Sequence, residues 1–167
     1  MLIRTEAPAD ILPINTLLKS AFETNAEAEL VMSLRENSRF TLSLVACTDD
    51  GELIGYALFT PVSLNGEQLG WQGLAPVAVK REFRHQGIAG NMIKEGLDSL
   101  YEFGYLGCVV LGNPEFYSRF GFVDATLFDM RSTWEVPEGV FRVKELAENE
   151  FFGKQGLIEY SPEFSLL

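Results

Sequence analysis

The chain has 167 residues, of which 47% are hydrophobic, and its 24 acidic and 13 basic side chains give a net charge of −11. This length and apolar content suit a single core, so we expect one domain over residues 1–167. The acidic balance disfavours a nucleic-acid-binding protein, which needs a basic face. An acidic surface can favour a cationic substrate, although acidity also serves simple solubility.

The sequence also limits location and metal chemistry. No apolar run approaches the roughly 20 residues that cross a bilayer, and the first residues lack the basic and then apolar pattern of a signal peptide. We therefore expect a cytoplasmic protein that does not enter a membrane. Two cysteines far apart and a single histidine form no metal motif, so no metal is expected.

The N-terminal half predicts a strand, two helices and a meander of strands. Asp10 can cap a helix whose apolar residues recur at helical spacing through Phe22, and a second helical pattern covers residues 26–34. Asn65-Gly66 is a strong hairpin signal between two apolar runs. Strands are expected over residues 2–5, 42–48, 53–62 and 71–79, the last three forming an antiparallel meander.

The C-terminal half begins with helical spacing after Gly87 and a helix stop at Gly104. A buried strand is expected over residues 106–111, and Pro114 can start a short helix. Weaker strand patterns follow over residues 141–143 and 157–160. The strand–helix–strand order across residues 71–111 predicts a parallel crossover, so the expected class is α/β or α+β, with a mixed sheet.

Pro76 lies inside the third strand of the meander. Proline has no N–H to donate to a ladder, so it belongs at a bulge or where a neighbouring strand is missing. The sequence therefore indicates a strand whose far half lacks a normal partner on one side.

The segment from Arg84 to Gly90 joins a predicted strand to a predicted helix. Its backbone N–H groups then lie at a helix N-terminus, where the partial positive charge favours an anion. Gly87 and Gly90 leave room for a diphosphate, and Arg84 and His85 can add charge-assisted contacts. The P-loop and dinucleotide-binding patterns are absent. By itself the turn indicates a phosphate-bearing ligand, or a solvated loop.

Two segments resemble the GNAT superfamily of N-acetyltransferases. Residues 77–89 end in Arg84-His85-Gln86-Gly87-Ile88-Ala89, which is similar to the family pattern Arg/Gln-x-x-Gly-x-Gly/Ala after a strand. Residues 112–122 resemble the later Tyr-x-x-x-Gly-Phe block, most of all in bacterial acetyltransferases with unassigned substrates. The resemblance covers about residues 1–125. It implies a single N-acetyltransferase domain with a mostly antiparallel central sheet flanked by helices, in which residues 126–167 complete the acceptor side.

The resemblance also implies acetyl-CoA as co-substrate and assigns its contacts. The strand carrying Val77 and Val79 would splay from the strand at residues 109–110, and the pantetheine arm would pair with its backbone as an added strand does. Asn113 would contact the pantetheine amide, unless it only caps the helix at Pro114. Backbone N–H groups holding the diphosphate would be those of Gln86, Gly87, Ala89 and Gly90, beside Arg84 and His85.

Tyr117 matches the tyrosine that protonates the departing thiolate in many family members. Such a donor is chemically useful because a phenol with a pKa near 10 stays protonated at neutral pH. The alternative is a core aromatic, since residues 116–122 contain several aromatic side chains. The resemblance implies the catalytic role.

The sequence supplies no clear general base. Some family members carry a glutamate on the strand before the phosphate turn, and the matching position here is Gly73. Glu23, Glu67 and Glu115 are conceivable but are better explained as surface carboxylates. An acceptor amine of low pKa would need no base. His85 suits a cofactor contact or plain exposure, and Cys108 suits the core.

We therefore expect an enzyme that moves an acetyl group from acetyl-CoA to an amine of a small molecule or protein by direct attack. The alternatives are a non-catalytic acyl-CoA-binding or sensing module, and an acyltransferase for another acyl-CoA or a hydroxyl acceptor. The acceptor side is expected from residues 22–29, Trp71 and the region of Trp134, which carry no readable motif. The resemblance also allows a homodimer.

Overall fold

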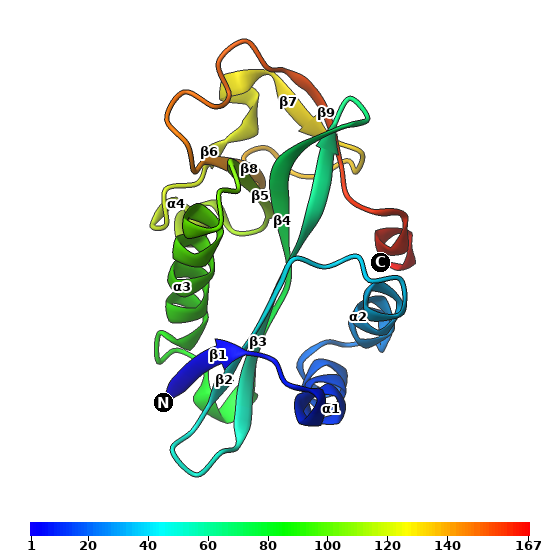
Figure 1. Ribbon diagram of the computed structural model, residues 1–167, viewed down its shortest axis with the longest axis vertical. Coiled ribbons are helices and arrows are strands. Elements are labelled where there is room, and N and C mark those ends of the chain that lie inside the picture. Colours follow the sequence, from blue (N-terminus) through cyan, green and yellow to red (C-terminus); the bar gives the residue numbers. More distant parts are fainter. The chain divides into compact units, whose positions relative to one another are not determined.

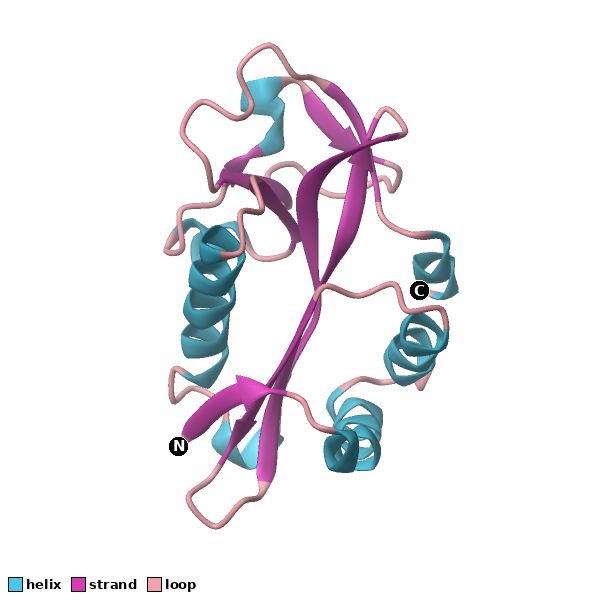
Figure 2. Cartoon of the chain, in the orientation of Figure 1, coloured by secondary structure: helices cyan, strands magenta, loops and turns pink.

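The computed structural model describes residues 1–167, apart from the side chain of Leu166. The chain forms two compact units: unit 1 comprises residues 1–59, 76–96 and 162–167, and unit 2 comprises residues 60–75 and 97–161. Figures 1 and 2 show the elements of both units. Three long elements contribute residues to each unit, namely β3 (Leu53–Leu64), β4 (Glu67–Val79) and α3 (Ile88–Glu102).

Unit 1 combines antiparallel strands with helices. β1 (Leu2–Thr5) pairs with β2 (Leu42–Cys47), and β2 pairs in turn with β3 from Leu42↔Phe59 onward. α1 (Ile11–Ala21) and α2 (Ala26–Glu36) form where apolar residues recur every three or four positions, and these residues are buried. The short 3₁₀ segment η4 (Pro162–Leu166) is tied to the end of α2, because Asn37 Nδ2 donates to Glu163 Oε2 at 2.6 Å.

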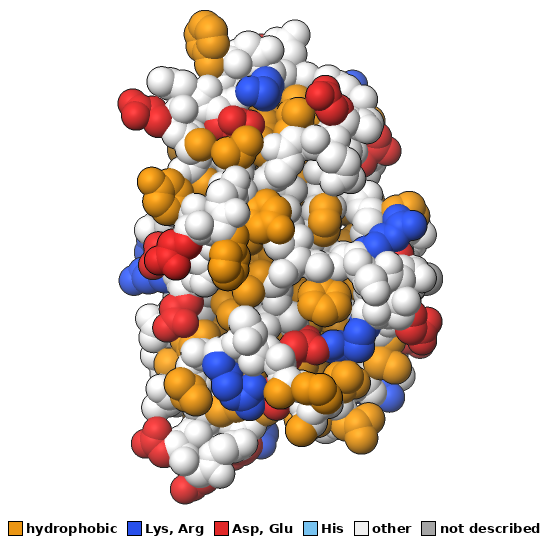
Figure 3. Space-filling view, viewed as in Figure 1, with side chains coloured by type: hydrophobic (Ala, Val, Ile, Leu, Met, Phe, Trp, Pro, Cys, Tyr) orange, Lys and Arg blue, Asp and Glu red, His pale blue; other side chains and the backbone are white. Residues whose placement is uncertain are grey.

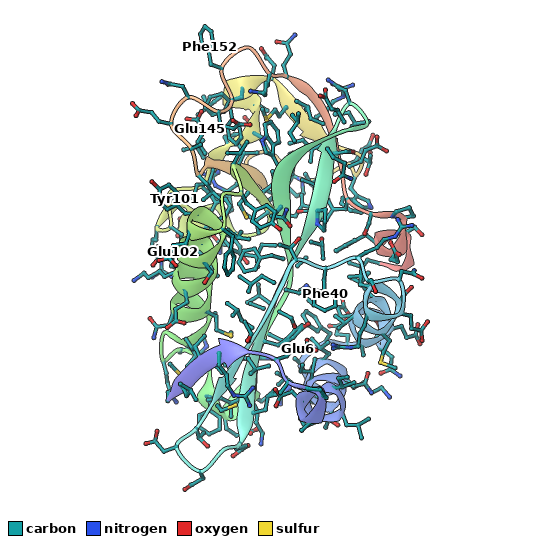
Figure 4. All side chains as sticks on the ribbon, in the orientation of Figure 1. Glu6, Phe40, Tyr101, Glu102, Glu145 and Phe152 are labelled. Carbon is teal, nitrogen blue, oxygen red and sulfur yellow. The ribbon has the colours of Figure 1, made fainter. Side chains whose placement is uncertain are left out.

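A polar network joins the strands of unit 1 to α2. The Glu6 carboxylate accepts hydrogen bonds from Arg35 and Ser43, and the Ser43 hydroxyl lies 2.8 Å from the Tyr56 hydroxyl. Figure 4 labels Glu6, whose side chain lies between the first strand and the helices of this unit. Burial raises the pKa of Tyr56, so its phenol stays neutral within the network.

Asp10 directly precedes α1 as predicted, but the expected cap is wrong in detail. Its side chain makes no capping bond to that helix. The carboxylate instead accepts from Arg4 at 2.6 and 3.1 Å and from the Ala7 N–H at 2.7 Å, closing the 3₁₀ turn η1 (Pro8–Asp10). The charged guanidinium of β1 offers a stronger partner than a neutral helix N–H.

Two glycines of unit 1 allow α3 to pack closely against β3. A β-carbon at Gly55 would lie 3.0 Å from Met92 Cε, and one at Gly96 would lie 2.3 Å from Phe59 Cε2. No larger residue fits at Gly96 without displacing the Phe59 ring. The α3 start is thereby fixed against the sheet, which sets the position of the turn that precedes it.

Unit 2 is built on one parallel and several antiparallel pairings. β4 runs parallel to β5 (Gly107–Leu111) from Trp71↔Gly107 to Leu74↔Val110. β5 pairs antiparallel with β8 (Phe141–Glu145), and β8 pairs with the short β6 (Val123–Asp124). β9 (Gly156–Glu159) joins the end of β3 antiparallel and β7 (Met130–Ser132) parallel. The remaining elements are α4 (Pro114–Ser118), η2 (Arg81–Phe83, in unit 1) and η3 (Ala125–Phe128).

Aromatic rings dominate the core of unit 2. Trp71 is 1% exposed and its ring meets that of Phe151 edge-on at 4.8 Å, while Trp71 Nε1 donates to Glu150 Oε2 at 2.9 Å. The Phe128 ring also meets the Phe151 ring edge-on, with the ring centroids 5.1 Å apart. Burying the polar edge of the tryptophan costs little because its N–H is paired.

The predicted fold class is confirmed: a mixed, mostly antiparallel sheet carries helices, with a parallel β4–β5 crossover. Asn65 and Gly66 both have positive φ angles, 52° and 83°, as the predicted hairpin turn requires. The β4–β5 pairing runs from Trp71 to Leu74 on β4, and Pro76 follows two residues later. The short strands β6 and β7 were not predicted.

The surface seen in Figure 3 carries acidic, basic and hydrophobic side chains interspersed, so this face has mixed charge. Among the described residues, no helix combines the length and apolar content that a bilayer span requires.

Candidate active site

The turn between β4 and α3, in unit 1, has the backbone geometry of an anion site. His85 and Gly87, one residue apart, both have left-handed φ angles, 63° and 82°. Alternating left-handed residues turn successive N–H groups toward one point, and α3 begins directly afterwards at Ile88. The first N–H groups of a helix have no partner within it, so they can bind an anion.

The turn is also open. His85, Gln86 and Gly87 are exposed, and Ala89 and Gly90 are half-buried. A β-carbon at Gly87 would meet no heavy atom within 4 Å. The structure therefore brings together, in one accessible turn, the residues that the sequence assigned to the diphosphate. Their contact with a cofactor stays a prediction.

Arg84 has a role that the sequence did not show. Its Nε donates to the Val79 carbonyl at 3.0 Å, and Nη2 donates to the Ala21 carbonyl at 3.4 Å. The guanidinium thus ties the end of β4 to the last residue of α1, where a helix leaves carbonyls unpaired. Val77 is half-buried and Val79 buried, so their side chains pack while their backbone continues β4.

In unit 2, Asn113 caps α4. Its Oδ1 accepts from the N–H groups of Glu115 at 2.8 Å and Phe116 at 3.3 Å. The capping alternative considered from the sequence is therefore confirmed. A contact with pantetheine stays a prediction, and it would fall to another atom of Asn113.

Tyr117 lies on α4 and is held by its neighbours. Its ring meets Phe116 at 5.0 Å and Phe122 at 5.8 Å, both edge-on. It also covers Gly112, where a β-carbon would lie 2.3 Å from Tyr117 Cε2. Burial, with a smaller contribution from nearby Cys108, raises the pKa of Tyr117 to about 12. A phenol of this kind stays protonated and can donate a proton, but it cannot serve as a base near neutral pH.

Gly73, the position expected for a base on β4, is covered by a residue from the C-terminal region. A β-carbon at Gly73 would lie 2.6 Å from Tyr160 Cε2 and 2.9 Å from Tyr160 Cζ and Val62 Cγ1. The Tyr160 ring meets Trp134 at 5.3 Å. Sequence reasoning missed Tyr160; a glycine inside an apolar strand was the one signal that another group comes close.

The carboxylates proposed from the sequence as bases are all exposed: Glu23, Glu67 and Glu115. Glu27, on the buried face of α2 in unit 1, is different. Its Oε1 is buried and has no hydrogen-bond partner among the described residues. Cys108 is fully buried and burial raises its pKa, which fits the predicted core role. Among the described residues no cluster of metal-binding side chains occurs.

Comparisons with known proteins agree with this geometry. The family model described as an acetyltransferase (GNAT) domain matches residues 3–124. The uncharacterized N-acetyltransferase YhbS of Escherichia coli strain K12 is 49% identical over 165 residues, covering 99% of each chain. The uncharacterized N-acetyltransferase YjhQ of the same strain is 36% identical over 118 residues, covering 68% of this chain and 65% of YjhQ.

Two solved structures are similar over nearly the whole chain. The GNAT family N-acetyltransferase YhbS from Escherichia coli, in complex with CoA, has a TM-score of 0.95 at 49% identity, covering 98% of this chain and 91% of that one. A GNAT family acetyltransferase from Brucella melitensis, in complex with acetyl-CoA, has a TM-score of 0.81 at 33% identity, covering 98% and 97%. The chain therefore belongs to the GNAT acetyltransferase family.

Proposed function

We propose that this chain transfers the acetyl group of acetyl-CoA to an amine by direct attack. The observation that carries the proposal is the open turn at His85–Gly87, whose left-handed residues lead straight into the N-terminus of α3. The CoA and acetyl-CoA complexes of the two similar structures support the choice of ligand.

The residues of each unit have separate tasks in this proposal. In unit 1, the N–H groups of Gln86, Gly87, Ala89 and Gly90 hold the diphosphate. The β4 backbone at Val77 and Val79 pairs with the pantetheine arm. Arg84 supports that strand end through the Val79 carbonyl. In unit 2, Tyr117 donates a proton to the sulfur as the C–S bond breaks. The acetyl-CoA thioester supplies the activated acyl group.

Three finer points remain part of the proposal: a cytoplasmic location, a homodimer, and completion of the acceptor side by residues 126–167. The acceptor is an amine of a small molecule or of a protein.

The test combines calorimetry with a CoA-release assay over a panel of amines. We expect acetyl-CoA to bind and free CoA to appear only when an amine is present. Binding without release from any amine would instead support a non-catalytic acyl-CoA-binding module. Preference for a longer acyl-CoA, or release with alcohols, would indicate a different acyltransferase. Absence of acetyl-CoA binding would overturn the proposal.

A further inference from the structure

A groove of about 440 Å³ lies within unit 2, lined by residues 124–126, 130–132, 134–139 and Phe141. Its floor is apolar and closed, since Ala125, Met130 and Phe141 are each no more than 6% exposed. Ligand pockets of proteins usually span about 300–1,000 Å³, so this groove is large enough for a ligand.

The rim of the groove is mainly acidic. Three carboxylates line it, those of Asp124, Glu135 and Glu138, against one guanidinium, that of Arg131. Hydrogen bonds from Thr126 lower the pKa of Asp124, so this carboxylate is charged at neutral pH. Glu135 and Glu138 are exposed, and the ion pairs of the described residues involve neither of them. The groove therefore favours a cationic ligand.

Trp134 adds an aromatic surface to this acidic rim. It is half-buried, and its loop is held at one end by the Ser132 hydroxyl, which accepts from the Trp134 N–H at 3.2 Å and donates to the Trp134 carbonyl at 2.9 Å. The other end is held by Arg142, which donates to the Gly139 carbonyl at 2.9 Å. An indole face attracts ammonium and guanidinium groups. The aromatic ring and the carboxylates thus favour the same ligand class, a lysine or arginine side chain.

β7, which lines the groove, has one edge without a partner strand. It pairs with β9 alone among the strands that the structure describes, and Figure 1 shows these two strands side by side. The Asp129 carbonyl accepts from the Gly156 N–H of β9 at 3.0 Å. Because backbone groups alternate between the two edges of a strand, Arg131 also faces β9, and the N–H and C=O groups of Met130 and Ser132 face the other edge. Such an edge is a template for an added strand.

We propose that this groove binds an extended basic segment of another protein, which adds as a strand to the free edge of β7 and places a lysine or arginine side chain against Trp134, Glu135 and Glu138. The strand edge favours a peptide over a free polyamine, because a polyamine has no amide groups to pair with the backbone. The charge disfavours a second copy of this chain, whose net charge is −11. The inference goes beyond the proposed acetyl transfer and does not depend on it.

The first experiment measures the charge contribution. The probe is a peptide of alternating lysine and valine with both ends capped, and calorimetry follows its binding without acetyl-CoA. We expect the double variant Glu135→Gln with Glu138→Gln to bind it about fivefold more weakly. The matched control is Glu67→Gln with Glu148→Gln, which removes the same charge from exposed positions of unit 2 outside the groove. Equal weakening in both, or no binding to the wild type, would overturn the inference.

The second experiment measures strand addition with the protein unchanged. The same peptide with every backbone amide N-methylated keeps its charges and side chains but donates no backbone hydrogen bond. We expect it to bind about tenfold more weakly than the parent peptide. Spermidine, a cation without amides, should also bind about tenfold more weakly. Equal affinity for either compound would overturn strand addition to β7.

Tryptophan fluorescence shows where the peptide binds. The chain has two tryptophans and Trp71 is 1% exposed, so Trp134 is the one that a ligand can contact. We expect saturating peptide to change the fluorescence of the wild type but not that of Trp134→Phe, with urea unfolding showing that the variant is folded. A change that persists in Trp134→Phe would place the peptide elsewhere and overturn the assignment.

Sedimentation tests the remaining occupant, a second copy of the chain. We expect the oligomeric state to be the same in the wild type and in Glu135→Gln with Glu138→Gln. A dimer that is altered only by this double variant would make the second copy the occupant and overturn the inference. All four measurements are independent of turnover, so their failure would leave the proposed acetyl transfer untouched, and absence of CoA release would leave the peptide site untouched.

Discussion

The ring of Tyr117 lies across the backbone of Gly112, so near that a β-carbon there would come within 2.3 Å of Cε2. Gly112 directly follows β5, and Asn113 then caps the helix that carries Tyr117. The Tyr117 ring therefore packs on the bare backbone of Gly112, and the rings of Phe116 and Phe122 contact it edge-on. Such support holds the Tyr117 hydroxyl in a narrow range of positions, which the proposed acid catalysis would require.

Tyr117→Phe should keep this packing and remove only the hydroxyl. We expect kcat to fall by about 10²–10⁴-fold, the usual contribution of a positioned acid, with acetyl-CoA affinity unchanged. Steady-state kinetics and calorimetry measure the two quantities. Tyr101→Phe is the matched control, because Tyr101 is 65% exposed. Unchanged turnover in Tyr117→Phe would remove this residue from the mechanism.

Gly112→Ala should displace the Tyr117 ring while leaving its chemistry present. A misplacement near 1 Å can cost about 100-fold in rate, so we expect a large fall in kcat with a folded protein. Gly107→Ala is the control at the other end of β5: its β-carbon would also crowd aromatic rings, Phe151 at 3.0 Å and Trp71 at 3.2 Å. If both variants lose equal activity for equal loss of stability, Gly112 has no specific link to the site.

Local signals in the sequence were enough for much of this arrangement. The Asn65-Gly66 turn, the parallel crossover after β4 and the α3 start at Ile88 follow from residues close together in the chain. The turn before α3 and the short helix that carries Tyr117 could be predicted because the family pattern is local.

The contacts that were missed join residues far apart in sequence. Nothing near Gly73 indicates that Tyr160 will cover it, and nothing near Arg84 indicates that its partners are the Val79 and Ala21 carbonyls. Strands as short as β6 and β7 form because β8 and β9 present a partner, so their own residues carry little signal.

Arg84 can contribute to acetyl-CoA binding in two ways: by contacting a phosphate directly or by stabilising the end of β4. Two substitutions distinguish these roles. Arg84→Lys keeps the positive charge but loses the hydrogen bond from Nε to the Val79 carbonyl. Arg84→Gln loses the charge as well as that hydrogen bond. We expect each variant to lower the free energy of unfolding by about 1 kcal/mol and to weaken acetyl-CoA binding equally. Calorimetry and urea unfolding provide the comparison, with exposed Arg81→Gln as control. Full affinity in Arg84→Lys would indicate a direct phosphate contact instead.

Alkaline pH should destabilise the protein through its buried phenols. Tyr117 has a pKa raised to about 12, against about 10 in an unfolded chain, so the folded state retains a proton that the unfolded state releases. Its contribution is fully present below pH 10 and is lost as pH rises to about 12. Tyr56 and Tyr160 act in the same direction.

Urea unfolding at several pH values measures this effect. We expect the free energy of unfolding to decline between about pH 10 and 12, and to decline less in Tyr117→Phe. Tyr101→Phe again serves as the exposed control and should follow the wild type. Identical slopes in wild type and Tyr117→Phe would show that the phenol is not buried in solution.

Gly87→Glu tests the phosphate turn with a close internal control. Gly87 and Gly51 have φ angles of 82° and 87°, and a β-carbon at either position meets nothing within 4 Å. Glutamate therefore imposes the same backbone strain at both, about 1 kcal/mol, and the same added charge. Only at position 87 would the carboxylate stand beside the bound diphosphate and repel it. We expect acetyl-CoA binding to be lost in Gly87→Glu and kept in Gly51→Glu, as measured by calorimetry. A diphosphate bound in this turn would be repelled by the added carboxylate. Normal acetyl-CoA binding in both variants would therefore show that the diphosphate binds elsewhere.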